Sequence, residues 1–147
     1  IVRNYDELVT QAQTLLARYR QPVLAQRYLD GDDVTVAVIQ RLNEIEVLTP
    51  LAGKLGRNMQ PVKIDSKLFN EINDSAMRIF KYLDCRDVAR IDYKQGADGQ
   101  LFFLEINPLP LFSRRRGYLT ESASLSGYTY EEVLSTIIAN TITRFTL

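Results

Sequence analysis

The sequence predicts an α+β domain in which helices pack on a mainly antiparallel sheet. Stretches of alternating polar and apolar residues come in neighbouring pairs, which is typical of strands in hairpins. Longer segments with apolar residues three or four positions apart separate these pairs, and this spacing indicates helices. The chain has 147 residues, 46% of them hydrophobic, which is enough for one core. We therefore expect one domain, with helices on one side of the sheet.

The first helix is predicted to begin after Asn4, because Asn4 and Glu7 have the spacing of a capping box. Apolar residues then recur at helical spacing until Pro22, which ends the helix. These residues are Leu8, Ala12, Leu15, Leu16 and Tyr19.

Two strands are predicted next, over residues 23–29 and 34–39, joined through Asp30-Gly31-Asp32. In the second strand three valines alternate with other residues, so they share one face of the sheet. They are Val34, Val36 and Val38. Residues 40–61 contain two glycines and two prolines, and we expect a less regular stretch there.

Two more helices are predicted from apolar stripes that follow capping residues. One is capped near Asp65 or Ser66, and the other begins where Thr129 and Glu132 form a capping box. The first stripe is Phe69, Ile72, Ala76, Ile79, Phe80 and Leu83, and the second is Val133, Leu134, Ile137, Ile138, Ile142 and Phe145. Residues 111–128 are expected to form a loop.

The strands predicted over residues 88–93 and 101–107 carry most of the functional information. Arg90 and Asp92 share one face of the first strand, and Glu105 and Asn107 share one face of the second. If the hairpin register sets Asp92 opposite Glu105, Arg90 falls opposite Asn107. Cross-strand neighbours have Cβ atoms roughly 4.5–5.5 Å apart, so two carboxylates and a carboxamide would surround one point.

Oxygen donors of this kind are what Mg2+ or Mn2+ needs. The alternative is a surface hairpin with ordinary charges, and the geometry alone does not choose between the two. Glu105 follows the apolar residues 101–104, which predicts that it is buried. A buried carboxylate needs a partner or a metal, and this favours the metal site.

Composition excludes several functional classes. Eighteen basic residues balance eighteen acidic ones, so no net charge attracts nucleic acid or an anionic membrane. The absence of histidine excludes Ser-His-Asp and Cys-His catalysis and a histidine-based zinc site. The single cysteine, Cys85, cannot form an internal disulfide, and this favours a cytoplasmic protein. Cys85 is expected to be a buried structural thiol. No apolar run approaches the roughly 20 residues of a membrane span.

Three stretches of the sequence resemble the ATP-grasp ligases, and among them the D-alanine–D-alanine ligase group. Residues 23–36 look like the hinge strand, loop and second strand of that family, and residues 128–132 look like the start of its closing helix. Residues 85–107 resemble its metal-binding hairpin, with Arg-x-Asp and Glu-x-Asn at the family's spacing. The chain also opens at Ile1, with no initiating methionine. We therefore expect residues 1–147 to be the C-terminal lobe of an ATP-grasp domain, excised from a longer chain.

The resemblance implies an ATP- and Mg2+-dependent carboxylate–amine ligase that is active only as the full-length protein. ATP would convert a small carboxylate to an acylphosphate, and an amine would then displace phosphate to form an amide. The resemblance implies no nucleic acid or membrane partner, and it leaves open a homodimer formed through other parts of the full-length chain. The alternative is a non-catalytic nucleotide-binding or structural ATP-grasp module.

The resemblance also assigns roles to single residues. Arg90 would be the catalytic cation beside the phosphate or the tetrahedral oxyanion, and Asp33 would accept hydrogen bonds from ribose. The metal ligands for Mg2+ or Mn2+ would be Asp92, Glu105 and Asn107, and the hinge over the adenine of ATP would be Gln26, Arg27, Tyr28 and Leu29.

This sequence departs from the family at several positions. Gln26 and Asp33 stand where glutamate is common, and Leu111 stands where a glycine usually lets substrate approach the backbone. A nearby serine that helps hold the acceptor's carboxylate is displaced by the run Arg114-Arg115-Arg116, which is either an anion site or a hydrated charge run. The stretch before Pro61 is short, and Lys54 or Arg57 is the candidate for the phosphate contact of the family's longer loop.

Overall fold

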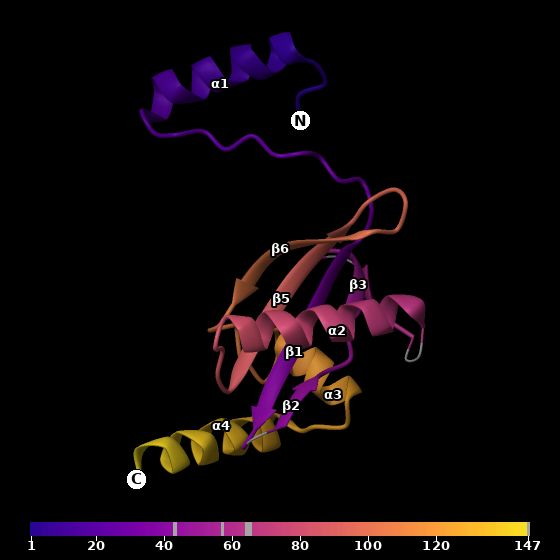
Figure 1. Cartoon of the computed structure of the whole chain (residues 1–147), viewed down its shortest axis with the longest axis vertical. Helices are drawn as coiled ribbons and strands as arrows, with labels where there is room; N and C mark the ends of the chain where they lie inside the picture. Colours follow the sequence, from indigo (N-terminus) through magenta and orange to yellow (C-terminus); the bar gives the residue numbers. More distant parts are fainter. Residues whose placement is uncertain (43, 57, 64–65, 147) are drawn as a thin grey trace.

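The computed structural model describes residues 1–42, 44–56, 58–63 and 66–146, and over these residues the chain forms four helices and one six-stranded sheet (Figure 1). The helices are α1 (Tyr5–Tyr19), α2 (Lys67–Tyr82), α3 (Tyr118–Leu125) and α4 (Tyr130–Phe145). The strands are β1 (Asp33–Arg41), β2 (Glu44–Val47), β3 (Leu51–Lys54), β4 (Asn58–Pro61), β5 (Val88–Gln95) and β6 (Leu101–Asn107).

The sheet is antiparallel throughout and has the order β4-β3-β1-β5-β6. Strand β2 also pairs with β1, beside its C-terminal half, while β3 pairs with its N-terminal end. β1, β3 and β5 therefore each pair on both sides, and β6 forms one edge. The predicted α+β class with a mainly antiparallel sheet is confirmed.

Helices cover both faces of the sheet, so the expectation of helices on one side was wrong. The predicted valine face of β1 packs against α2, where Ile72, Ala76 and Phe80 are buried. On the opposite face Ala37 and Ile39 pack against α3 and α4. Six consecutive residues of β1, 34–39, are buried, which is the pattern of a strand covered on both faces.

The predicted caps of α2 and α4 are confirmed. Ser66 Oγ accepts a hydrogen bond from the Phe69 N–H at 3.1 Å, while Asp65 lies outside the described residues. Thr129 and Glu132 form the full capping box at the start of α4. Each cap satisfies backbone donors that the first helical turn cannot satisfy by itself, which fixes where the helix begins.

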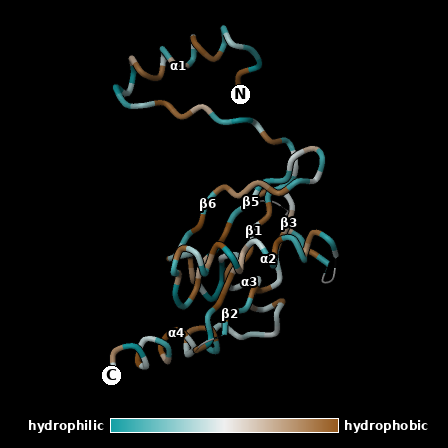
Figure 2. Tube along the Cα trace, in the orientation of Figure 1, coloured by the Kyte–Doolittle hydropathy of each residue, from teal (hydrophilic) through white to brown (hydrophobic). Residues whose placement is uncertain are grey.

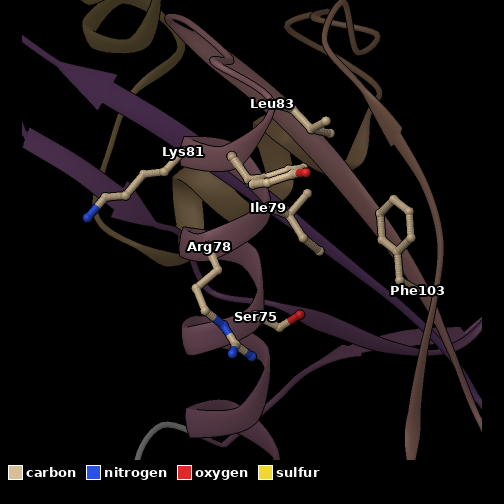
Figure 3. Close-up of a pocket in the computed structure, with 7 residues that line it drawn as sticks. Ser75, Arg78, Ile79, Lys81, Leu83 and Phe103 are labelled. Atoms are coloured by element: carbon tan, nitrogen blue, oxygen red, sulfur yellow. The ribbon is translucent and has the colours of Figure 1, made fainter.

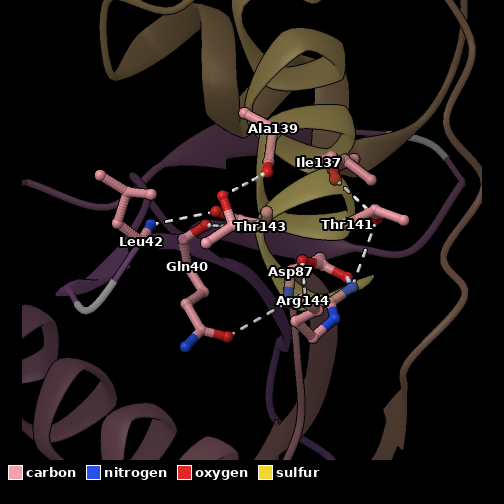
Figure 4. Close-up of polar contacts among 9 residues, drawn as sticks. Gln40, Leu42, Asp87, Ile137, Ala139, Thr141, Thr143 and Arg144 are labelled. Carbon is pink, nitrogen blue, oxygen red and sulfur yellow. Dashed lines mark hydrogen bonds and ion pairs between the residues drawn. The ribbon is translucent and has the colours of Figure 1, made fainter. Parts of the chain in front are cut away.

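Polar contacts attach α4 to the ends of β1 and β5 (Figure 4). The amide of Asn140 donates to the backbone oxygen of Gln40 at 2.7 Å and accepts from the Leu42 N–H at 3.1 Å. Arg144 donates to both carboxylate oxygens of Asp87, at 2.8 and 2.6 Å. These hydrogen bonds from Arg144 outweigh burial and hold the pKa of Asp87 below its ordinary value.

Residues 23–29 were predicted to form a strand, and this was wrong. They are extended but pair with no strand among the described residues, and α1, which precedes them, has no buried residue. Figure 1 shows α1 and this segment standing apart from the sheet. A strand needs a neighbour for its backbone groups, and alternating hydrophobicity alone does not supply one.

The segment joins the sheet at Gly31, whose N–H donates to the backbone oxygen of Gln95 at 3.1 Å. A Cβ atom at residue 31 would lie 2.3 Å from that oxygen, so only glycine allows this approach.

Four short elements were missed by the sequence analysis. Strands β2, β3 and β4 lie in the stretch predicted to be irregular, and each has only four residues, too few for a periodic signal. Helix α3 lies in the predicted loop and begins after Gly117 without a side-chain cap. In the described part of the chain no helix is both long and apolar enough to cross a membrane.

Much of the predicted apolar stripe of α4 lies on its outer side. Val133 is buried, whereas Leu134, Ile138, Ile142 and Phe145 are exposed. Figure 2 shows apolar residues recurring along both α1 and α4, the two helices at the ends of the molecule. The predicted helix is confirmed, and most of its apolar stripe is exposed.

We predict that Asp87→Asn lowers the free energy of unfolding by about 1 kcal/mol at neutral pH, because it weakens a partly buried charge-assisted pair. The pKa of Asp87 is lowered in the folded state, so its stabilisation is complete above the ordinary carboxyl pKa. It is lost as the pH falls through the lowered folded-state pKa. Urea unfolding of both proteins at neutral and acidic pH measures the difference.

Asp84→Asn is the control, since Asp84 forms a more exposed pair with Arg86. Its effect should be small at either pH. If Asp87→Asn lowers the free energy of unfolding by the same amount in acid as at neutral pH, the stabilising role of this ion pair is contradicted.

Candidate metal and nucleotide site

The hairpin of β5 and β6 has the register on which the hypothesis of a metal site depended. Asp92 lies opposite Glu105, and Arg90 lies opposite Asn107. The register shifts between Asp92 and Tyr93, so that Tyr93 pairs with Phe103 on β6. The three predicted metal ligands and the predicted catalytic arginine therefore come together on one face of the sheet.

Asp92 is the most constrained of these side chains. Its Oδ1 accepts a hydrogen bond from Thr35 Oγ1 at 2.6 Å. Arg90 donates to the same carboxylate through Nε, at 3.1 Å to both oxygens, and through Nη2, at 2.8 Å to Oδ2. The side chains of Arg90 and Asp92 are only 21% and 16% exposed, so this pair is largely shielded from solvent.

Glu105 was expected to be buried, and this was wrong, because its side chain is 66% exposed. β6 is an edge strand, so the apolar run before Glu105 does not lead into the core. The nearest cation is Arg90, whose Nη2 lies 3.9 Å from Glu105 Oε1. The Glu105 carboxylate is therefore available to a ligand from solution.

Asn107 marks the end of β6. Its Oδ1 accepts a hydrogen bond from the Leu109 N–H at 3.1 Å, which begins the turn out of the sheet. A carboxamide oxygen has two lone pairs, so one remains for a metal ion.

These residues fit a Mg2+ site by donor type. Among the described residues no group of three or more Asp, Glu, Cys and His side chains could hold a metal by itself. The hairpin offers two carboxylates and one amide oxygen instead. Mg2+ commonly takes one or two carboxylates and completes its shell with water and substrate phosphates, so this smaller set suffices.

Asp33 lies on the same face, two residues before Thr35 along β1. It accepts hydrogen bonds from Lys94 Nζ at 2.9 Å and from the Leu55 N–H at 3.2 Å. Burial raises the pKa of Asp33, but these hydrogen bonds and the charge of Lys94 outweigh it, and the pKa is lowered. Asp33 is thus an ionised acceptor at neutral pH and is already engaged by a cation.

Sequence reasoning missed both Thr35 and Lys94. Lys94 continues the polar alternation of Arg90 and Asp92 along β5, and that spacing was the available signal. Thr35 is a lone polar residue between two buried valines, and its polarity at a buried strand position was the only sign.

The predicted adenine hinge lies at the surface. Gln26, Arg27 and Tyr28 are exposed and Leu29 is partly buried. The Arg27 guanidinium carbon lies 5.8 Å from the centre of the Phe102 ring, and Phe102 pairs with Lys94 across the hairpin. This cation–π contact brings the hinge segment to the sheet that carries the candidate site.

The remaining cationic candidates divide into those that are engaged and those that are not. Lys54 Nζ donates to the Gly31 oxygen at 3.0 Å and lies 3.5 Å from Asp32, whereas Arg57 lies outside the described residues. Arg114 pairs with Glu131 and lies 4.9 Å from the ring centre of Tyr130. The side chain of Arg114 is therefore engaged by residues at the start of α4.

Arg115 and Arg116 are exposed, and the structure leaves them as the candidates for an anion site in this loop.

Two other features lie away from this site. An apolar pocket between the end of α2 and β6 lies on the opposite face of the sheet, lined by Ile79, Leu83 and Phe103 (Figure 3). Cys85 was expected to be buried but is only partly buried, and burial together with the charge of Asp84 raises the pKa of its thiol. Neither feature contributes to the carboxylate cluster.

Comparison with known proteins identifies the family. Residues 52–139 match the family model described as D-ala D-ala ligase C-terminus, which is more than half of the chain. The chain belongs to this family.

Similar curated proteins and a solved structure extend the match beyond residues 52–139. The chain is 29% identical to a D-alanine--D-alanine ligase from Aquifex aeolicus, over 94% of this chain and 50% of that protein. It is 28% identical to a Sinorhizobium fredii protein named y4sG, over 94% of this chain and 46% of that protein. A crystal structure of D-alanine--D-alanine ligase from Bacillus anthracis complexed with ATP has a TM-score of 0.75 at 20% identity, covering 97% of this chain and 48% of that one.

The chain thus spans about half the length of the curated relatives it matches. The predicted resemblance and the ATP-grasp fold are confirmed. The roles of individual site residues stay predictions, because the comparisons address the family and the fold.

We predict that Lys94→Met raises the pKa of Asp33, because it removes a hydrogen bond and a positive charge from the carboxylate. A carbon-detected NMR titration of the Asp33 carboxyl measures the change. Lys54→Met is the matched control, since Lys54 acts on Asp33 only through its charge, and it should raise the pKa less. An Asp33 titration that is unchanged in Lys94→Met would show that the pair does not form in solution.

Proposed function

We propose that this chain is the C-terminal lobe of an ATP- and Mg2+-dependent carboxylate–amine ligase. The observation that carries the proposal is the hairpin register, which sets Arg90 beside Asp92 and both across from Glu105 and Asn107. Membership of the D-Ala-D-Ala ligase family supports the reaction class. The proposal assigns the full reaction to a longer protein, and it is supported by the fact that the chain spans about half the length of its curated relatives.

The proposed reaction forms an amide in two displacements. A carboxylate oxygen attacks the γ-phosphorus of ATP, the bond to the bridging oxygen breaks, and ADP leaves. The amine then attacks the acyl carbon of the acylphosphate, phosphate leaves, and the amine nitrogen loses a proton. The first step converts a poor leaving group into phosphate, which is a good one.

The chain's own residues would serve this reaction mainly by positioning and by neutralising charge. Asp92, Glu105 and Asn107 would hold one or two Mg2+ ions, which supply charge stabilisation at the β- and γ-phosphate oxygens. Arg90 would place its guanidinium against the transferring phosphoryl group or the tetrahedral oxyanion. It lies on the same face as all three ligands, and its long side chain can reach beyond Asp92.

The nucleotide would lie along the same face toward the hinge segment. Asp33 is two residues from Thr35 on β1 and is held as a carboxylate by Lys94, which suits it to accept hydrogen bonds from ribose hydroxyls. The backbone and apolar surface of the hinge would contact adenine. This hinge consists of Gln26, Arg27, Tyr28 and Leu29.

The rival function is a non-catalytic nucleotide-binding or structural module. The shortened stretch before Pro61 and the exposed Leu111 in place of glycine favour it. The proposed ligase is favoured by the donor set of the hairpin, since two carboxylates and an amide oxygen beside an arginine are the groups that Mg2+ and phosphate bind. Metal-dependent ATP turnover by the full-length protein distinguishes the two functions.

We predict that Asp92→Asn, Glu105→Gln and Asn107→Ala each lower turnover of the full-length protein by orders of magnitude while the fold remains intact. A bound metal contributes several kcal/mol of charge stabilisation in the transition state. Steady-state rates measured across a Mg2+ titration test this. Glu71→Gln, which changes an exposed carboxylate on α2, is the control. A Glu105→Gln protein with unchanged rate and Mg2+ dependence would overturn the assignment of Glu105.

We also predict that the amine acceptor is not D-alanine alone. The side chain of Leu111 leaves less room for a small acceptor to approach the backbone. Arg115 and Arg116 favour an acceptor with an added carboxylate or phosphate, which guanidinium groups hold through two hydrogen bonds. A panel of amines, assayed by phosphate release, measures kcat/KM for each. The panel should rank an anionic amine above D-alanine.

The double variant Arg115→Ala and Arg116→Ala should lower kcat/KM for that amine, whereas Arg86→Ala, in the exposed segment between α2 and β5, should not. If D-alanine as both substrates gives the highest kcat/KM, the predicted preference for an anionic amine is wrong.

A further inference from the structure

The hydroxyl of Thr35 is buried in the sheet and lies beside Asp92, on the neighbouring strand. Thr35 is 1% exposed and lies on the inner strand β1, opposite Asp92 on β5. Its Oγ1 donates to Asp92 Oδ1 across only 2.6 Å. A β-branched side chain in the middle of a sheet has little rotational freedom, so the position of this donor is fixed by the backbone.

Arg90 holds the same carboxylate through Nε and Nη2, at 2.8 to 3.1 Å. It differs from Thr35 because it is a long side chain and is itself a cation. A divalent cation that binds Asp92 would repel the Arg90 guanidinium and compete with it for the same oxygens.

Once Arg90 withdraws, Thr35 is the donor that remains on Asp92 among the described contacts. We propose that Thr35 is the positioning residue of the metal site. Its hydroxyl fixes Asp92 Oδ1 to the sheet and leaves Oδ2 for the cation that displaces Arg90. This inference rests on the proposed metal-dependent function.

The physical need for such a residue comes from the metal. Mg2+ requires nearly ideal octahedral geometry at about 2.0–2.1 Å, so a carboxylate that rotates away from its position binds poorly. Partners that orient a metal ligand typically change metal affinity roughly 10–100-fold when they are removed. A threonine that merely satisfied its own hydroxyl in the core would have no effect of this kind.

The test is Mn2+ binding to the full-length protein with a non-hydrolysable ATP analogue, followed by electron paramagnetic resonance of the free Mn2+. Thr35→Val keeps the shape of the side chain but deletes the donor, and it should weaken Mn2+ binding roughly 10–100-fold. Thr35→Ser restores the donor and should bind Mn2+ close to the wild-type protein. Thr35→Ala deletes the same donor and replaces Thr35→Val if that protein does not fold.

Thr49→Val is the matched control, because Thr49 is also a largely buried threonine and its Oγ1 lies 3.0 Å from Ser126 Oγ, away from Asp92. It should bind Mn2+ like the wild-type protein. Wild-type affinity in both Thr35→Val and Thr35→Ala would overturn the inference. An equal loss in Thr49→Val would overturn it too, because the effect would then be general destabilisation.

Asp92→Asn separates this inference from the function on which it rests. If the wild-type protein and Asp92→Asn bind Mn2+ equally, the proposed metal site itself is wrong. If Asp92→Asn loses binding while the Thr35 variants keep it, only the role of Thr35 fails.

Discussion

Everything in this site depends on the pairing of β5 with β1 on one side and with β6 on the other. Because side chains alternate between the faces of a sheet, one register sets Thr35, Asp92 and Glu105 in a row across three strands. A slip of one residue would turn the carboxylates into the core. The apolar residues that face α2, among them Val36 and Ile91, make such a slip very costly and so fix the site.

The two faces of the sheet perform different tasks. The face under α2 is a continuous apolar core, while the other face changes character along β1. Ala37 and Ile39 lie under α3 and α4, and two residues further back Thr35 and Asp33 carry polar contacts. The polar cluster thus begins where the helical cover ends, so the packed core directly supports its side chains.

The hairpin and the helices with strong periodicity were predictable from sequence, because their signals are local, whereas the register of the hairpin entered only as a hypothesis. Short strands such as β2 and the uncapped helix α3 carry no such signal. The exposure of Glu105 could not be read from its apolar neighbours, since it follows from the edge position of β6. The contacts of Thr35 with Asp92 and of Lys94 with Asp33 join residues far apart in sequence, and only the fold brings them together.

The most direct test of the central claim is a crystal structure of the full-length protein with Mn2+ and a non-hydrolysable ATP analogue, with anomalous diffraction to locate the metal. Our account predicts a manganese peak within bonding distance of Asp92, Glu105 and Asn107. It also predicts that the Arg90 guanidinium has left Asp92 while Thr35 stays in contact with it. A manganese peak elsewhere, with Arg90 still paired to Asp92, would contradict the account.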